Sequence, residues 1–263
     1  GGRGGGMSLT TLLVVGAICL MLGINPLELL SGGGVSLDQP VEQGPVSPQD
    51  EANARFVKRV LADTEDVWNR VFQETKRQYE EPKLVLFRRA TPTACGTGDA
   101  RMGPFYCPLD RKVYIDLAFF ADLQSKFKAP GDFAQAYVIA HEVGHHVQTL
   151  LGVAARVQEQ KQRLDQVRAN ELQVRMELQA DCLAGVWANR TNQMKQRLQP
   201  GDIEEGLRAA SAIGDDTLQR QAQGRVVPES FTHGTSAQRV RWFSKGFQTG
   251  QAQACDTFGP GEL

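Results

Sequence analysis

The residues most able to do chemistry are His141, Glu142 and His145, which form a His-Glu-x-x-His motif. Apolar residues recur at helical spacing around it, from Phe133 to Gln148, so the motif is expected on a buried helix. Residues four apart share one face of a helix, and the two histidines can therefore present imidazole nitrogens to one metal ion. Glu142 is then placed to take a proton from a water molecule that the metal activates. A chance match is the alternative interpretation.

A third metal ligand must come from elsewhere, because a catalytic zinc site uses three protein ligands and keeps one position open. In the long form of the motif a third histidine stands six residues after the second, where this chain has Leu151. A second apolar helical pattern, over residues 170–188, carries Glu177 and Asp181 four apart. We predict Glu177 as the third ligand and Asp181 as the acceptor for the free N–H of a ligand histidine. The alternative interpretation is that Glu177 and Asp181 lie on a solvent-exposed face of the helix and bind no metal.

These motifs resemble the zincin metallopeptidases whose third ligand is glutamate. More closely, residues 94–258 resemble the bacterial neutral zinc metallopeptidase family of membrane-anchored proteins. The stretches that carry the resemblance are Gly103–Pro108, Val113–Asp116, His141–Gln148, Glu177–Cys182 and Thr232–Gly234. The resemblance implies a zinc-dependent hydrolase that acts on peptide or protein substrates, with one Zn²⁺ ion. We expect a zincin-like α+β fold, mainly α, with a small antiparallel sheet.

Composition limits the remaining possibilities. The chain has 263 residues, enough for one sizeable domain and an appendage, and its formal net charge is −1. Such a balance gives no indication of a nucleic-acid partner.

The appendage is expected at the N-terminus. Residues 9–24 contain no charged residue and approach the length of a membrane-spanning helix. A cleaved signal peptide, an uncleaved anchor and a buried core helix are the possible interpretations, and we favour the anchor because no good cleavage site follows. We therefore predict a flexible N-terminus and transmembrane anchor (1–30), a Gly/Pro-rich linker (31–50) and a zincin-like domain (51–263). Arg3 favours a single-pass protein of the inner (cytoplasmic) membrane with its catalytic domain on the periplasmic side.

Four of the five cysteines lie outside the apolar segment. Cys95 and Cys107 flank a glycine-rich turn region and are predicted to pair, which leaves Cys182 to pair with Cys255. Disulfides would agree with export from the cytoplasm. A zinc–thiolate site is the rival interpretation, although the chain has no Cys-x-x-Cys pair.

The elements that must position these residues can be read from the apolar pattern. Helices are predicted over 52–79, 117–127 and 236–247, a strand over 83–88, and a hairpin from strands 105–107 and 112–116. Asp132 is the expected N-cap of the motif helix. In zincins an edge strand beside this helix pairs with an extended peptide substrate.

Two further histidines need an interpretation. His233, in Thr232-His233-Gly234, can donate a hydrogen bond to the oxyanion of a tetrahedral intermediate, or it can cap or pack. His146 faces away from the motif histidines by about a hundred degrees of helix, so it is interpreted as a supporting or structural residue.

The sequence as a whole predicts a zinc metalloendopeptidase with Glu142 as general base and His233 as an assisting residue. The alternative is a membrane-tethered binding or scaffold protein with a structural or degenerate zinc site. A structural site has no use for Glu142 and normally has four protein ligands.

Overall fold

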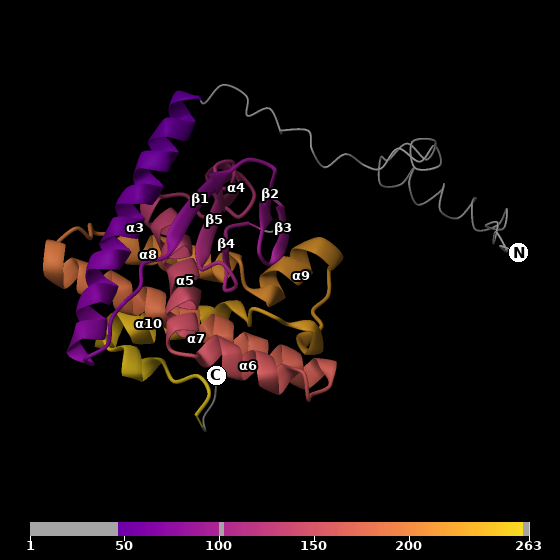
Figure 1. Cartoon of the computed structure of the whole chain (residues 1–263). Helices are drawn as coiled ribbons and strands as arrows, with labels where there is room; N and C mark the ends of the chain where they lie inside the picture. Colours follow the sequence, from indigo (N-terminus) through magenta and orange to yellow (C-terminus); the bar gives the residue numbers. More distant parts are fainter. Residues whose placement is uncertain (1–46, 100–102, 260–262) are drawn as a thin grey trace, which may run out of the picture. The chain divides into compact units, whose positions relative to one another are not determined.

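The computed structural model describes residues 47–99, 103–259 and 263. This part of the chain is mainly helical with a small sheet, as the predicted α+β class requires (Figure 1). In chain order the elements are α3 (Pro48–Glu74), β1 (Lys83–Phe87), β2 (Ala90–Thr93), β3 (Gly96–Asp99), β4 (Phe105–Cys107), β5 (Lys112–Asp116), α4 (Phe119–Ser125), α5 (Asp132–Leu150), α6 (Val153–Lys161), α7 (Gln166–Lys195), α8 (Asp202–Ala212), α9 (Asp215–Gln223), η2 (Pro228–Ser230), α10 (Ser236–Thr249) and η3 (Ala252–Cys255).

The predicted N-terminal anchor lies outside the described residues, as does most of the predicted linker. Among the helices that are described, none combines the length and the apolar character that a membrane crossing requires.

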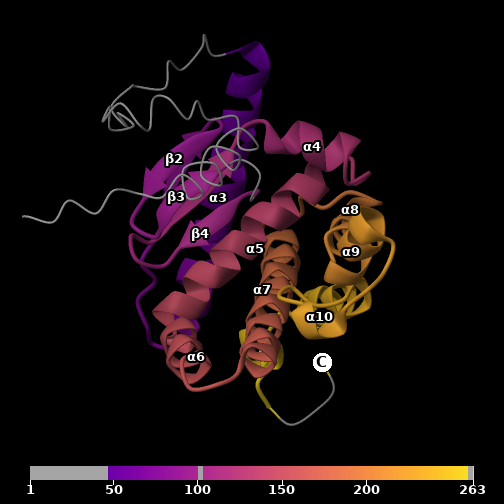
Figure 2. The same cartoon turned by 90° about the vertical axis from the view of Figure 1, so that its right-hand side faces the viewer.

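Helix α5 forms the middle of the domain. It packs against α7 and α8 on one side and contacts β4 on the other, so that in Figure 2 it lies between the strands and the C-terminal helices. Its sequence explains this position, because residues on every face are buried, including Ala134, Ile139, Val143 and Val147. A helix that is apolar on all sides is stable only when other elements surround it.

The crossing of α7 and α10 depends on two glycines. A Cβ atom added at Gly185 of α7 would lie 2.1 Å from the carbonyl oxygen of Phe243. One added at Gly246 of α10 would lie 1.9 Å from the carbonyl oxygen of Cys182. These are contacts with backbone, so no side-chain rotation can make room, and the two helices can approach this closely only with glycine at both positions.

The three-stranded sheet has the order β1-β5-β4. Strand β4 pairs antiparallel with β5, with Phe105 opposite Tyr114, which confirms the predicted hairpin. Strand β1 pairs with β5 in parallel, with Lys83 opposite Lys112. The prediction of an antiparallel sheet is therefore wrong for this pair, and the sheet is mixed. The segment between β1 and β5 contains β2, β3 and β4, and this long connection returns the chain to the same end of the sheet.

The helix boundaries differ from those predicted in ways that local chemistry explains. Helix α3 begins at Pro48, inside the stretch predicted as linker, because Ser47 and Asp50 form a capping box and proline suits the first helical position. Asp132 was expected to cap α5, but the N-cap is Gly131, and Asp132 is the first helical residue.

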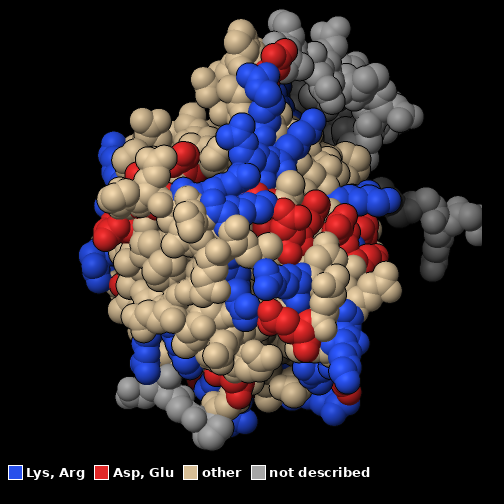
Figure 3. Space-filling view, turned by 90° about the vertical axis from the view of Figure 1, so that its left-hand side faces the viewer, with Lys and Arg blue, Asp and Glu red and all other residues tan. Residues whose placement is uncertain are grey.

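Charged side chains of both signs lie close together on the face shown in Figure 3. Ion pairs join α3 to the chain around the end of α7: Lys195 contacts Asp63 and Asp66, and Arg197 contacts Asp63. Asp63 is buried, whereas its two basic partners keep contact with solvent, so these pairs are partly screened and contribute less to stability than the apolar core does.

Replacing Gly246 by alanine should destabilise the protein by about 3 kcal/mol, because the added methyl group would overlap the backbone of α7. Gly224 is the matched control. Its added Cβ atom would meet nothing within 4 Å, so only its φ of +69° opposes alanine, at about 1–2 kcal/mol. Urea unfolding followed by circular dichroism measures both values. Equal losses in the two variants would contradict the close crossing of α7 and α10.

Candidate metal centre

Three predicted residues come together where α5 crosses α7. His141 and His145 lie on consecutive turns of α5, and Glu177 lies on α7. The Oε2 atom of Glu177 is 3.1 Å from Nε2 of His141 and 3.3 Å from Nε2 of His145. One ligand atom from each residue lies within 4.8 Å of the other two. Two imidazole nitrogens and a carboxylate oxygen, converging in a largely buried position, fit a Zn²⁺ ion, which binds this donor set in catalytic sites.

Asp181 lies one turn after Glu177 and is completely buried. Its Oδ1 atom is 2.8 Å from Nδ1 of His141, so it accepts this N–H and leaves Nε2 directed at Glu177. This is the contact that the predicted role of Asp181 requires. Burial lowers the pKa of His141, but the carboxylates of Asp181 and Glu177 outweigh burial and raise it to about 10.

Arg239 compensates the buried charge of Asp181. It lies on α10, is buried, and donates from Nε to Oδ2 of Asp181 at 2.8 Å and from a terminal nitrogen to Oδ1 at 2.9 Å. The same side chain also contacts the hydroxyl of Tyr137 and the carbonyl oxygen of Ile213. Burial raises the pKa of Asp181, but Arg239 and His141 outweigh it and lower this pKa to about 2. Sequence reasoning missed Arg239, although a charged residue beside the apolar Val240, Trp242 and Phe243 was a usable signal.

The other two candidate ligands also have partners, which sequence reasoning likewise missed. Nδ1 of His145 is 2.8 Å from Oε1 of Gln148. The second carboxylate oxygen of Glu177 accepts a hydrogen bond of 2.7 Å from Gln173, one turn earlier on α7. Each of the three candidate ligands is therefore held by a side chain at the atom that faces away from the metal position.

Glu142 is buried beside His141, and burial raises the pKa of its carboxyl group, although the two nearby histidines act in the opposite direction. Within the described part of the chain, its carboxylate has no hydrogen-bonding partner. A buried carboxylate of this kind is free to receive a proton.

His233 does not belong to the cluster of candidate ligands. Its side chain is half exposed, and its Nδ1 atom is 3.2 Å from Oδ1 of Asp215. The hydrogen bond to Asp215 raises the pKa of His233, and the charge of Glu177 adds to this effect. The backbone N–H groups of residues 232–234 all donate to the other Asp215 oxygen, so Asp215 fixes the whole turn.

His146 is completely buried on the other side of α5. Its Nε2 atom lies 2.6 Å from the carbonyl oxygen of Glu80, and its Nδ1 atom lies 3.0 Å from the hydroxyl of Tyr106. These contacts join α5 to β4 and to the segment after α3, which is the structural role that the sequence left open.

Both predicted disulfides are present, Cys95–Cys107 and Cys182–Cys255. The interpretation of these four cysteines as a zinc–thiolate site is therefore wrong. The second disulfide attaches the segment after α10 to the helix that carries Glu177.

Comparison with known proteins agrees with this geometry. The family described as "Putative neutral zinc metallopeptidase" matches residues 1–258. The chain is 51% identical to "Uncharacterized protein YpfJ" of Escherichia coli (strain K12) over 258 residues, which cover 98% of this chain and 88% of that protein. It is 40% identical to "Uncharacterized protein Rv2575" of Mycobacterium tuberculosis (strain ATCC 25618 / H37Rv) over 263 residues, covering 93% of this chain and 86% of the relative. No solved structure matches the chain.

Replacing Arg239 by methionine should cost about 3–5 kcal/mol of stability at neutral pH, because Asp181 would remain buried without its counter-charge. The sign of the pH dependence follows from the pKa of Asp181. That pKa is about 2, so the stabilising contribution of the ion pair is present above roughly pH 4 and is lost as the pH falls toward 2. In the variant the pKa of Asp181 should rise, and the deficit should shrink as acid protonates this carboxylate. Urea unfolding at several pH values, with the exposed Arg241→Met as control, measures the difference. A deficit that does not change with pH would contradict the role of the pair.

Proposed function

The chain belongs to the neutral zinc metallopeptidase family, and on this premise we propose that it is a zinc-dependent endopeptidase. The observation that carries the proposal is the convergence of His141, His145 and Glu177, with Glu142 buried beside them. Zinc held by Nε2 of each histidine and Oε2 of Glu177 would act as a Lewis acid on the scissile carbonyl and would activate a water molecule.

Glu142 acts as the general base. Its carboxylate takes the proton of the attacking water and then donates it to the nitrogen of the leaving amine. The raised pKa of this carboxyl group supports the role, because a base that must later act as an acid works best when its pKa approaches neutrality. The absence of a competing hydrogen-bond donor within the described residues supports it as well.

His233 assists by donating a hydrogen bond to the oxyanion that develops on the scissile carbonyl. Asp215 supports this assignment in two ways. It orients the imidazole through Nδ1, and it raises the pKa of His233, which favours the protonated, donating form.

The substrate is an extended peptide that pairs with β4. Among the described strands, β4 has a neighbour on one side only, namely β5, and it contacts α5, which carries the two histidines. An edge strand offers free backbone N–H and C=O groups, to which an extended peptide can add as a further strand.

The domain acts outside the cytoplasm, on the periplasmic side of the membrane to which residues 1–30 would anchor it. The two disulfides support this part of the proposal, because such bonds persist in oxidising compartments and are rare in the cytosol.

Replacing Glu177 by alanine should abolish stoichiometric zinc binding, because two histidines alone make an incomplete site. Glu171→Ala, an exposed position on the same helix, is the control and should keep the metal. Metal content is measured on purified protein after dialysis. Full zinc in Glu177→Ala would remove Glu177 from the ligand set.

Replacing Glu142 by glutamine should leave zinc content and thermal stability unchanged, while hydrolysis of an unfolded protein such as casein falls by a factor of about 10²–10⁴. Glutamine keeps the size of the side chain but cannot accept the proton. Zinc bound equally by both proteins, with no cleavage by either, would favour the scaffold alternative. Undiminished hydrolysis by Glu142→Gln would place the general base elsewhere in the chain.

A further inference from the structure

Gln148 is a buried polar residue in the last turn of α5 that the proposed chemistry does not use. It has no exposed surface, and its Oε1 atom lies 2.8 Å from Nδ1 of His145, three residues earlier. A buried carboxamide is costly unless its polar atoms are paired, so each of its contacts is informative.

The orientation of the Gln148 carboxamide is determined by a backbone carbonyl. Its Nε2 atom lies 2.7 Å from the carbonyl oxygen of Met176 on α7. A carbonyl oxygen can only accept, so the NH₂ group must face Met176 and Oε1 must face the imidazole. Oε1 can only accept as well. Nδ1 of His145 therefore carries a proton, and Nε2 is the nitrogen on the side where Glu177 lies 3.3 Å away.

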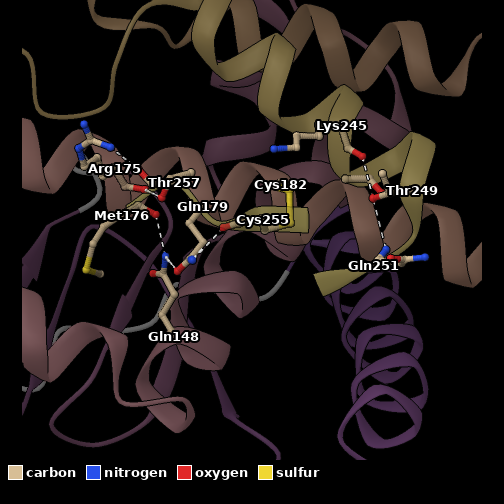
Figure 4. The surroundings of a disulfide bond; sticks show 11 residues. Gln148, Arg175, Met176, Gln179, Cys182, Lys245, Thr249, Gln251, Cys255 and Thr257 are labelled. Carbon is tan, nitrogen blue, oxygen red and sulfur yellow. Dashed lines mark hydrogen bonds between the residues drawn. A yellow bond between two sulfur atoms is a disulfide. The ribbon is translucent and has the colours of Figure 1, made fainter. Parts of the chain in front are cut away.

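The carbonyl oxygen of Cys255 favours the same orientation of the Gln148 carboxamide, acting through Gln179. Nε2 of Gln148 also donates to Oε1 of Gln179 at 3.1 Å, and Nε2 of Gln179 donates to the carbonyl oxygen of Cys255 at 2.9 Å. Figure 4 shows the two glutamines in series between α5 and the segment that carries Cys255. The disulfide from Cys255 to Cys182 fixes this carbonyl to α7, and Thr257 donates to the carbonyl oxygen of Arg175 two residues further on.

We propose that Gln148 is the positioning residue for His145, and that the hydrogen-bond series Cys255–Gln179–Gln148 keeps the proton of His145 on Nδ1 so that Nε2 can bind the metal. Two carbonyl oxygens, those of Met176 and Cys255, set the direction of every bond in the series. The disulfide is thereby connected to the metal centre as well as to the fold. The inference rests on the proposed metal site but not on peptide hydrolysis.

The two candidate histidine ligands are therefore held by different chemistry. His141 donates to a carboxylate, which increases the basicity of the ring, whereas His145 donates to a neutral carboxamide, which orients the ring without adding charge. A carboxylate could not replace the carboxamide at position 148, because one of its oxygens would have to face the carbonyl oxygen of Met176 and would repel it.

The test is Gln148→Met, which keeps the length of the side chain and removes both hydrogen-bonding groups. Zinc affinity, measured by competition with a chromogenic chelator, should fall about 10- to 100-fold. In the nuclear magnetic resonance spectrum, the Nδ1–H of His145 should be protected from solvent exchange in the unaltered protein and unprotected in the variant. Gln193→Met, an exposed glutamine near the end of α7, is the matched control and should change neither measurement.

Gln179→Met tests the remote part of the series and serves also if Gln148→Met does not fold. Its zinc affinity should fall less than about tenfold, because the carbonyl oxygen of Met176 still holds Gln148. Solvent exchange of the Nδ1–H proton of His145 should accelerate. Removing the disulfide by Cys182→Ala with Cys255→Ala should lower the zinc affinity when Gln179 is present. In the Gln179→Met protein the same removal should cause little further loss of zinc affinity, since both changes interrupt one series.

The proposal is overturned if both glutamine variants keep the affinity and the exchange protection of the unaltered protein. It is overturned in its remote part if the losses from Gln179→Met and from the missing disulfide simply add. Failure of the proposed hydrolysis gives a different result, because zinc affinity and exchange protection then still depend on Gln148 although no peptide is cleaved. Failure of the metal site is recognised separately, since the unaltered protein then binds no zinc while the exchange protection of His145, which needs no metal, still depends on Gln148.

Discussion

The close crossing of α5 and α7 is the constraint on which the rest of the structure depends. A Cβ atom at Gly144 would lie 3.0 Å from the carbonyl oxygen and 3.1 Å from the Cα atom of Ala180, so the two backbones almost touch there. Gly144 precedes His145 directly, and Ala180 lies within one turn of Glu177. Because the helices meet at two small residues, the longer side chains on either side of the contact can extend toward one another. A larger residue at position 144 would separate the helices and with them the nitrogen and oxygen atoms that are now 3.1–3.3 Å apart.

This crossing has an electrostatic consequence, since it places ionisable groups between two apolar helices. Burying a charge without a partner is costly, and the structure offsets that cost group by group. The carboxylate of Asp181 receives two hydrogen bonds from Arg239, and the second oxygen of Glu177 receives one from Gln173. The same bonds restrict the rotation of each side chain. Stability and orientation therefore have one origin here, because each group that satisfies a buried atom also fixes the direction of a candidate ligand.

The sequence was sufficient to group His141, His145, Glu177 and Asp181, because spacing of four residues on a helix is a property of the helix alone and needs no knowledge of the fold. The pairing of the cysteines followed from their number and separation in the same way, and the structure confirms it. Gln148 was missed although its contact with His145 is local, three residues apart on one helix, and only its bonds to α7 are tertiary. The position of Arg239 in an apolar helix was a signal, but its partners depend on how α5, α7 and α10 are placed in space, which no local period encodes. The parallel pairing of β1 with β5 was missed for the same reason, since register across a long connection is a tertiary property.

The C-terminal part of the chain is therefore more than a cover for the two motif helices. It contributes Arg239, which fixes the partner of His141, and the carbonyl oxygen of Cys255, which lies at the end of the series leading to His145. Neither residue contacts a candidate ligand atom at the metal position. Arg239 holds the carboxylate that contacts His141, and the carbonyl oxygen of Cys255 holds Gln179, which contacts the partner of His145. The close approach of Gly185 and Gly246 holds α10 against α7, and the disulfide holds the segment that follows. The α5–α7 crossing brings the donor atoms together and supplies the direct partners of both imidazoles, and the chain after α7 holds Asp181 and Gln179 in place behind them.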